Sequence, residues 1–133
     1  MRAIVAVVLV LTLTACGGGE KSAETAGTAS RAPAALAVID TPTLKSLLAA
    51  ADPPLILDVR TPGEYSTGHI EPSVNIPDYA LAERLGELEA HRGEPVVVLC
   101  ERGGRSAKAA RILSEAGFTV LDYSGGMNAW REQ

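Results

Sequence analysis

The strongest chemical feature of this 133-residue chain is Cys100 together with the loop that follows it. An apolar run over residues 95–99 ends at this cysteine, a loop with two glycines comes next, and a helical stretch over 106–115 follows the loop. That order places a thiol close to the N–H groups of a helix N-terminus, where negative charge is favoured. A cysteine in such surroundings ionises readily and is a good nucleophile. The alternative is a small buried cysteine at the end of a strand.

The loop after Cys100 is predicted to bind an anionic substrate through these six residues: Glu101, Arg102, Gly103, Gly104, Arg105 and Ser106. Its two glycines permit the positive φ and the close approach that a cradle of N–H groups requires. Arg102 would attract an anion and Glu101 would oppose it, although either could be a solvated side chain. Arg105 either holds an anionic donor or makes a structural ion pair, with Asp58 as the candidate partner.

Apolar runs and turn residues predict how this loop is positioned. Short strands are expected at 36–40, 55–59, 74–76, 96–99 and 118–121. Helices are expected after an N-cap at Thr41, after a cap at Asp78, over 106–116 with Gly117 behind it, and over 127–131. The residues at 61–63 indicate a turn.

Alternation of strands with helices predicts an α/β fold with a mainly parallel five-stranded sheet flanked by helices. Ligands in such sheets bind beyond the carboxyl ends of the strands. Cys100 follows one strand and the segment from Asp58 to Arg60 follows another, so the two loops are expected to share a pocket. Asp58 and Arg60 are predicted to support the second loop rather than to react.

Four stretches resemble the rhodanese-like family in order and spacing. They are the segment from Asp58 to Ile70, the tripeptide Asn75-Ile-Pro, the loop from Cys100 to Ser106, and the closing segment Gly125-Gly-Met-Asn-Ala-Trp130. The resemblance covers roughly residues 36–131. It implies one rhodanese-like domain at 36–133 and a sulfurtransferase activity that needs no cofactor.

The resemblance also implies a mechanism. A donor such as thiosulfate loads a sulfane sulfur onto Cys100, and a thiophilic acceptor, either cyanide or a thiol, removes it. The alternative is a non-catalytic module that carries a persulfide or senses sulfur or oxidants with a protein partner. Cysteine phosphatases place an arginine one residue later than Arg105, at the position of Ser106, and the tighter loop here suits a single sulfur atom.

The N-terminus is similar to a bacterial lipoprotein signal. Residues 1–15 form a basic and then apolar signal peptide that is too short to span a bilayer as a helix. Cys16 follows directly, and the resemblance implies cleavage before it and lipidation of its sulfur. An ordinary signal peptide cut near Ala15 and an uncleaved anchor are the alternatives. Residues 16–35 are then a lipidated cysteine plus a flexible tether.

The amino-acid composition limits the classes of partner that the chain is expected to bind. The chain carries 12 basic and 16 acidic residues, and loss of residues 1–15 would leave a net charge of −5. This balance argues against nucleic-acid binding, which needs clustered cations. With two cysteines and two scattered histidines, no zinc site is expected. The expected location is the bacterial cell envelope, lipid-anchored to a membrane and facing the periplasm.

Overall fold

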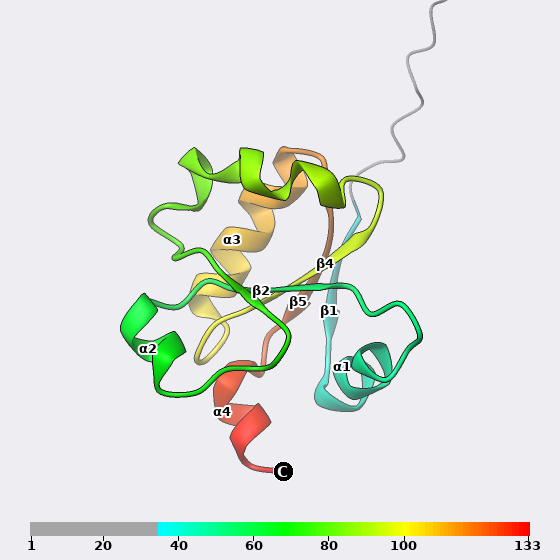
Figure 1. The fold of residues 1–133 in the computed structure, drawn as a ribbon, viewed down its shortest axis with the longest axis vertical. Coiled ribbons are helices and arrows are strands. Elements are labelled where there is room, and N and C mark those ends of the chain that lie inside the picture. Colours follow the sequence, from blue (N-terminus) through cyan, green and yellow to red (C-terminus); the bar gives the residue numbers. More distant parts are fainter. Residues whose placement is uncertain (1–34) are drawn as a thin grey trace, which may run out of the picture. The chain divides into compact units, whose positions relative to one another are not determined.

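The computed structural model describes residues 35–133, which form a five-stranded sheet with helices on both faces (Figure 1). The strand order is β1-β5-β4-β2-β3, and every neighbouring pair is parallel. The strands are β1 (Leu36–Ile39), β2 (Leu55–Asp58), β3 (Val74–Asn75), β4 (Pro95–Leu99) and β5 (Thr119–Tyr123). The α/β prediction is therefore confirmed. The predicted signal peptide, Cys16 and nearly all of the tether lie outside the described residues.

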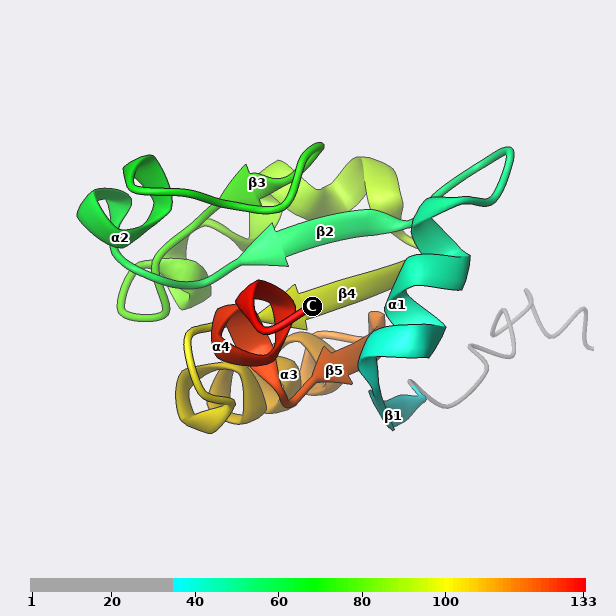
Figure 2. The same cartoon turned by 90° about the horizontal axis from the view of Figure 1, so that it is seen from below.

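Helices cover the two faces of the sheet. On one face lie α1 (Thr41–Leu48) and α4 (Gly126–Arg131); on the other lie α3 (Gly104–Glu115) and two 3-10 segments, η1 (Leu81–Glu83) and η2 (Leu85–His91). Figure 2 shows α1 and α4 in front of the sheet and α3 behind it. A short helix, α2 (Pro62–Ser66), follows β2. No helix within residues 35–133 has the length and apolar character needed to cross a membrane.

The core follows from the alternation of side chains along the central strands. In β4, Val96 and Val98 face α3, whereas Val97 and Leu99 face α1 and α4, and all four are fully buried. A strand covered on both faces is apolar at nearly every position, which is the pattern of residues 95–99. Cys100 continues the α3 side of this alternation.

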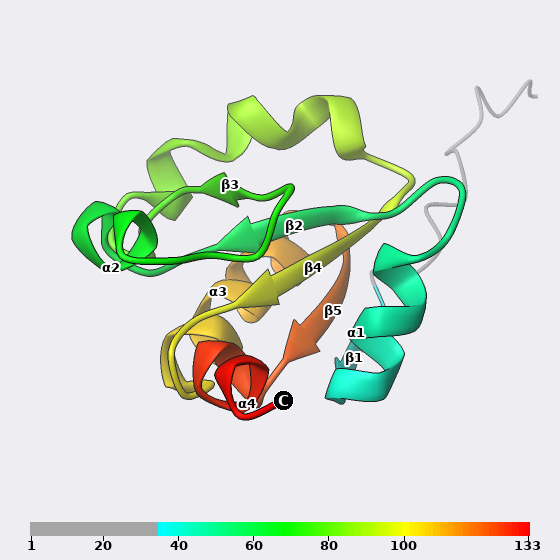
Figure 3. The ribbon, with the colours of Figure 1, turned by 60° about the horizontal axis from the view of Figure 1, so that its bottom comes forward.

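The carboxyl ends of the strands lie in register. Leu99 is paired with Asp58 on one side and with Tyr123 on the other, and Tyr123 is paired in turn with Ile39. The strands point in one direction in Figure 3. Residues that follow different strands are consequently brought to one edge of the sheet, as expected for a parallel α/β fold.

Local polar groups decide where the first two helices begin. The N-cap of α1 is Asp40 rather than Thr41, because the Asp40 carboxylate accepts the Thr43 N–H at 3.0 Å. The expected turn at 61–63 is the start of α2. Its Thr61 and Glu64 form a capping box, in which each side chain bonds the other residue's backbone N–H.

The helix predicted after Asp78 is wrong. The segment forms η1 and η2 instead, and the N-cap of η1 is Ala80, without a side-chain bond. Leu81 and Leu88 are nevertheless buried. Gly86 lies inside this run and disfavours a continuous α-helix, so the leucines reach the core from tighter turns.

Candidate active site

Cys100 lies immediately beyond β4, beneath the N-terminus of α3. The residue is 1% exposed, and its Sγ accepts the backbone N–H of Gly103 at 3.0 Å. It is the free cysteine of the described part of the chain. A main-chain donor aimed at the sulfur favours a negative charge there.

The backbone of Gly103 has a conformation that an L-residue rarely adopts. Its φ is +96°, and a Cβ at this position would lie 2.4 Å from the carbonyl oxygen of Ser124. Glycine therefore lets the loop turn tightly enough for the Gly103 N–H to reach the sulfur. α3 begins at the next residue, and within residues 35–133 no protein acceptor meets the first-turn N–H groups of Gly104 and Arg105.

A pocket opens over this loop. Its volume is about 360 Å³, and its walls are formed by these residues: Cys100, Glu101, Arg102, Gly104 and Arg105. Another cavity, of about 310 Å³, lies among prolines and Val74 near the start of β2. The pocket at the loop is the candidate site because it combines a nucleophile, free N–H groups and cations.

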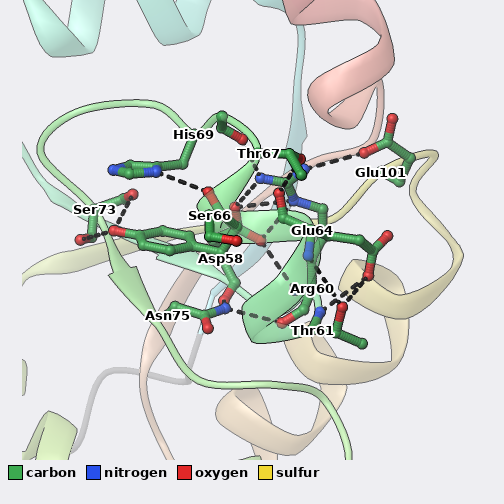
Figure 4. A network of polar contacts seen from close by, with 12 residues as sticks. Asp58, Arg60, Thr61, Glu64, Ser66, Thr67, His69, Ser73, Asn75 and Glu101 are labelled. Carbon is green, nitrogen blue, oxygen red and sulfur yellow. Dashed lines mark hydrogen bonds and ion pairs between the residues drawn. The ribbon is translucent and has the colours of Figure 1, made fainter.

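Arg60 and Asp58 form a buried ion pair beside Glu101 (Figure 4). Neither residue lines the pocket, so the expectation that the two loops share it is corrected. Both are fully buried, and their ion pair is 2.7 Å long. Burial disfavours the charge on Arg60, but hydrogen bonds to Asp58 and Glu101 outweigh it and raise the pKa of Arg60. The amide of Asn75 holds the same segment by donating to the carbonyls of Asp58 and Arg60, both at 2.9 Å. The predicted structural role is consistent with these contacts.

Glu101 does not face the pocket as an uncompensated charge. Its carboxylate pairs with Arg60 at 3.2 Å and also with Arg131 of α4. The expectation that Glu101 repels anions or is simply solvated is therefore corrected. Two guanidinium groups balance its charge, and the spacing of the residues along the sequence predicted neither ion pair.

Arg105 pairs with Glu64 and not with Asp58. The two N···O distances are 2.7 and 2.6 Å, which makes the pair bidentate. Asp58 is already occupied by Arg60, whereas Glu64 is brought forward by the capping box of α2. The Arg105 guanidinium, assisted by the N–H and hydroxyl of Thr61, lowers the pKa of Glu64 to about 2.

Arg102 and Ser106 differ from each other in their surroundings. Arg102 is exposed, and among the residues that the structure describes no carboxylate pairs with it. The Ser106 side chain is fully buried and does not line the pocket. Its hydroxyl donates to Asp122 of β5 at 2.7 Å and also lies 3.1 Å from the Gly103 carbonyl.

Comparisons with known proteins identify the family of the chain. The family model described as Rhodanese-like domain matches residues 40–133 of the chain. The chain belongs to the rhodanese-like family. It is 42% identical over 92 residues to the adenylyltransferase and sulfurtransferase MOCS3-1 of Zea mays. The matched segment covers 65% of this chain but only 20% of that protein. It is 35% identical over 71 residues to the thiosulfate sulfurtransferase PspE of Escherichia coli, which covers 53% of this chain and 68% of that protein.

A solved structure shows the same fold. The rhodanese-related protein of Thermoplasma volcanium superposes with a TM-score of 0.65 at 36% identity, covering 72% of this chain and 91% of that one. Both relatives carry the word sulfurtransferase in their names, and the chain spans only 20% of the Zea mays protein.

Several residues around the rhodanese-like site were not predicted as site residues. Glu64 carried a usable pattern, since Thr61-x-x-Glu64 is a capping box, but its pairing with Arg105 is a tertiary contact. Asp122 and Arg131 have no local pattern that marks them. His69 is a packing residue, because its ring stacks on the Tyr65 ring and its Nδ1 bonds the Tyr65 carbonyl oxygen. Within residues 35–133, no group of three potential metal ligands is found.

Proposed function

We propose that this protein is a sulfurtransferase that moves a sulfane sulfur through a persulfide on Cys100. The observation that carries the proposal is the hydrogen bond that the Gly103 N–H donates to Cys100 Sγ. Cys100 lines a pocket whose wall also includes Arg102 and the first residues of α3. A nucleophilic thiolate, an attractive cation and free N–H groups are the parts that transfer of an anionic sulfur group requires.

The first half-reaction loads the enzyme. The Cys100 thiolate attacks the outer sulfur of thiosulfate, a new S–S bond forms, and the bond between the two thiosulfate sulfurs breaks. Sulfite leaves with the electron pair of that bond. Arg102 attracts the incoming anion, and the N–H groups of Gly104 and Arg105 stabilise the negative charge that moves across the pocket.

The second half-reaction unloads the enzyme. Cyanide or a thiolate attacks the outer sulfur of the Cys100 persulfide, and the bond from that sulfur to Sγ breaks. Thiocyanate or a new persulfide leaves, and the Cys100 thiolate is restored. Atoms and electrons balance over the two steps, so no external oxidant or reductant takes part.

The loop length supports sulfur transfer over phosphoryl transfer. The position at which a cysteine phosphatase has its arginine is occupied by Ser106, whose hydroxyl is bonded to Asp122. Of the two loop arginines, Arg105 is held by two contacts to Glu64, and Arg102 comes four residues before the position of the phosphatase arginine. A tetrahedral phosphate would therefore lack the guanidinium that such chemistry uses.

The proposal includes attachment to a membrane on the periplasmic side. Its support comes from the sequence alone: a short apolar run over residues 1–15 followed by Cys16 and a glycine-rich tether. Stable anchoring requires more than one acyl chain, which a lipidated and acylated N-terminal cysteine would supply.

The deciding experiment uses the full-length protein with thiosulfate and cyanide. The wild-type protein is expected to form thiocyanate through many turnovers, and mass spectrometry after thiosulfate alone is expected to show one added sulfur on Cys100. Cys100→Ser is expected to abolish both results. Cys16→Ser, which alters the other cysteine of the chain, is the matched control and is expected to retain both.

Two outcomes would refute the enzymatic proposal. Thiocyanate formation by wild type at the rate of the Cys100→Ser protein would show that no catalysis occurs at this site. One sulfur loaded per chain without turnover would identify a persulfide carrier or sensor instead.

A further inference from the structure

The loop that follows Cys100 is joined to α4 by backbone hydrogen bonds. The Met127 N–H donates to the Cys100 carbonyl at 2.8 Å, and the Asn128 N–H donates to the Glu101 carbonyl at 3.1 Å. These N–H groups belong to the first turn of α4, where a helix supplies no partners of its own. The loop carbonyls therefore accept the N–H groups that would otherwise lack a partner at the start of the helix, and the helix in turn fixes the direction of the two carbonyls.

This contact depends on Gly126. Its φ is +60°, and a Cβ there would lie 2.5 Å from the Cys100 oxygen and 2.6 Å from the Glu101 oxygen. No side chain fits between α4 and the loop. Gly125, by contrast, has an ordinary negative φ, and a Cβ on it would meet Ala129 of α4 rather than the loop.

A side-chain contact joins the same two segments. Arg131, near the end of α4, pairs with the Glu101 carboxylate. Arg131 is 46% exposed, and Glu101 is further held by the buried Arg60. Figure 4 shows Glu101 beside Arg60. α4 is thus attached to the loop at its first turn by main-chain bonds and at its last residue by an ion pair.

The geometry of the peptide bond determines where the N–H groups of the loop point. In a planar trans peptide the C=O and the next N–H point in opposite directions. Since α4 draws the carbonyls of Cys100 and Glu101 to its own face of the sheet, the N–H groups of Glu101 and Arg102 point toward the opposite face. That is the side of the α3 cluster, to which the Cys100 side chain belongs.

We propose that α4 is the positioning element of the active-site loop, and that Gly126 and Arg131 orient the N–H groups that stabilise negative charge on the Cys100 sulfur. Neither residue touches the reacting atoms. The proposal rests on Cys100 being the nucleophile of the proposed function, but it concerns the loop geometry and not the identity of the substrate.

The test measures alkylation of Cys100 by neutral iodoacetamide across pH, in the full chain carrying Cys16→Ser so that one thiol reacts. Gly126→Ala is expected to slow alkylation at pH 7 by about tenfold or more, because misplacing catalytic groups by about 1 Å costs up to a hundredfold. The difference is expected to close at alkaline pH, where the thiol ionises without help. Gly86→Ala in η2, where a Cβ would have nothing within 4 Å, is the matched control and is expected to stay near wild type.

A second variant keeps the test decisive if Gly126→Ala does not fold. Arg131→Gln is expected to slow alkylation at pH 7 by about two- to fivefold, the range of an exposed ion pair, and Arg131→Lys is expected to recover most of the loss. Arg84→Gln, which removes an exposed arginine paired with Glu87, is expected to change nothing.

The outcomes separate the two proposals. Alkylation rates of Gly126→Ala and Arg131→Gln equal to wild type at pH 7 would overturn the positioning role, even if the protein forms thiocyanate. Slowed alkylation in both variants, closing at alkaline pH, would support the positioning role even if no thiocyanate is formed by the wild type, a result that would overturn the proposed function alone.

Discussion

Arg102 is the loop cation whose charge is left for a ligand. In the described chain, Arg60, Arg105 and Arg131 each have a carboxylate partner, whereas Arg102 is exposed and has none. Glu101, its neighbour, is neutralised by two guanidinium groups. The local field at the pocket is therefore more favourable to anions than the acidic composition of the chain suggests.

Replacing Arg102 by glutamine is expected to raise the KM for thiosulfate by about fivefold at low salt, since one surface charge contributes about 1 kcal/mol. Added salt should shrink the effect because it screens exposed charges. Lys108→Gln, which removes an exposed cation from α3, is the matched control. An unchanged KM in steady-state thiocyanate assays of Arg102→Gln would contradict the assignment.

Asp122 is a buried carboxyl group whose cost to stability can be measured. The residue is 5% exposed, and burial raises its pKa above the usual value despite the hydrogen bond from Ser106. For a carboxyl whose folded pKa is raised, stability falls as pH rises from the unfolded pKa through the folded one, and the loss persists at neutral pH.

Asp122→Asn is consequently expected to resist urea better than wild type at pH 7, because the asparagine carbonyl still accepts the Ser106 hydroxyl and carries no charge. The advantage should vanish below about pH 4, where the aspartate is protonated in both states. Asp52→Asn, at an exposed position, should change little. Lower stability of Asp122→Asn at pH 7 would show that the carboxylate itself is required.

At the scale of elements, the loop is held by two short helices, α2 and α4. α2 reaches it through Glu64 and Arg105, and α4 reaches it through backbone N–H groups and Arg131. The Glu64–Arg105 pair links the capping box of α2 to the first turn of α3. Because both side chains are about one-third exposed, solvent screening limits the stabilisation to about 1 kcal/mol.

Glu64→Gln should therefore lower the free energy of unfolding by about 1 kcal/mol at pH 7. The folded pKa of Glu64, about 2, lies below the ordinary 4.5, so its contribution is complete above pH 4.5 and is lost as pH falls toward 2. In urea titrations, the free energies of unfolding of wild type and Glu64→Gln should differ at pH 7 and become similar at pH 2.5. A difference independent of pH would assign the effect to packing instead.

For the whole molecule, the parallel topology decides where function lies. The last residues of the five strands are in register, so the segments after β2, β4 and β5 meet at one edge although they are far apart in sequence. The opposite edge holds the cavity lined by prolines, and within residues 35–133 no cysteine lies there. Chemistry at the carboxyl edge leaves the rest of the domain as a scaffold.

The proposed membrane attachment concerns the whole chain and is tested apart from catalysis. Full-length protein made in a bacterium is expected to partition into detergent, and Cys16→Ser is expected to move it to the aqueous phase while thiocyanate formation is retained. Partition that does not depend on Cys16 would contradict a lipid anchor on that residue.

Local patterns in the sequence were sufficient for the strands and most helices, and they singled out Cys100 as the candidate nucleophile. Burial on both faces makes a parallel strand apolar throughout, which marked the runs before Asp58 and Cys100. The two glycines after Cys100 marked a tight loop, and Gly103 indeed has a positive φ. Residues 78–88 were misassigned because a leucine period is shared by α-helices and by successive 3-10 turns.

Charge pairing around the loop was decided by the tertiary structure alone. Asp58 is near Arg60 in sequence, but Arg105–Glu64 and Arg131–Glu101 join residues 41 and 30 positions apart. No periodicity relates such positions, because strand order and crossovers determine which side chains meet. The sequence by itself determined which thiol and which loop could carry the chemistry, since those depend on neighbouring residues. Only the folded chain decided which charges remain free for a substrate.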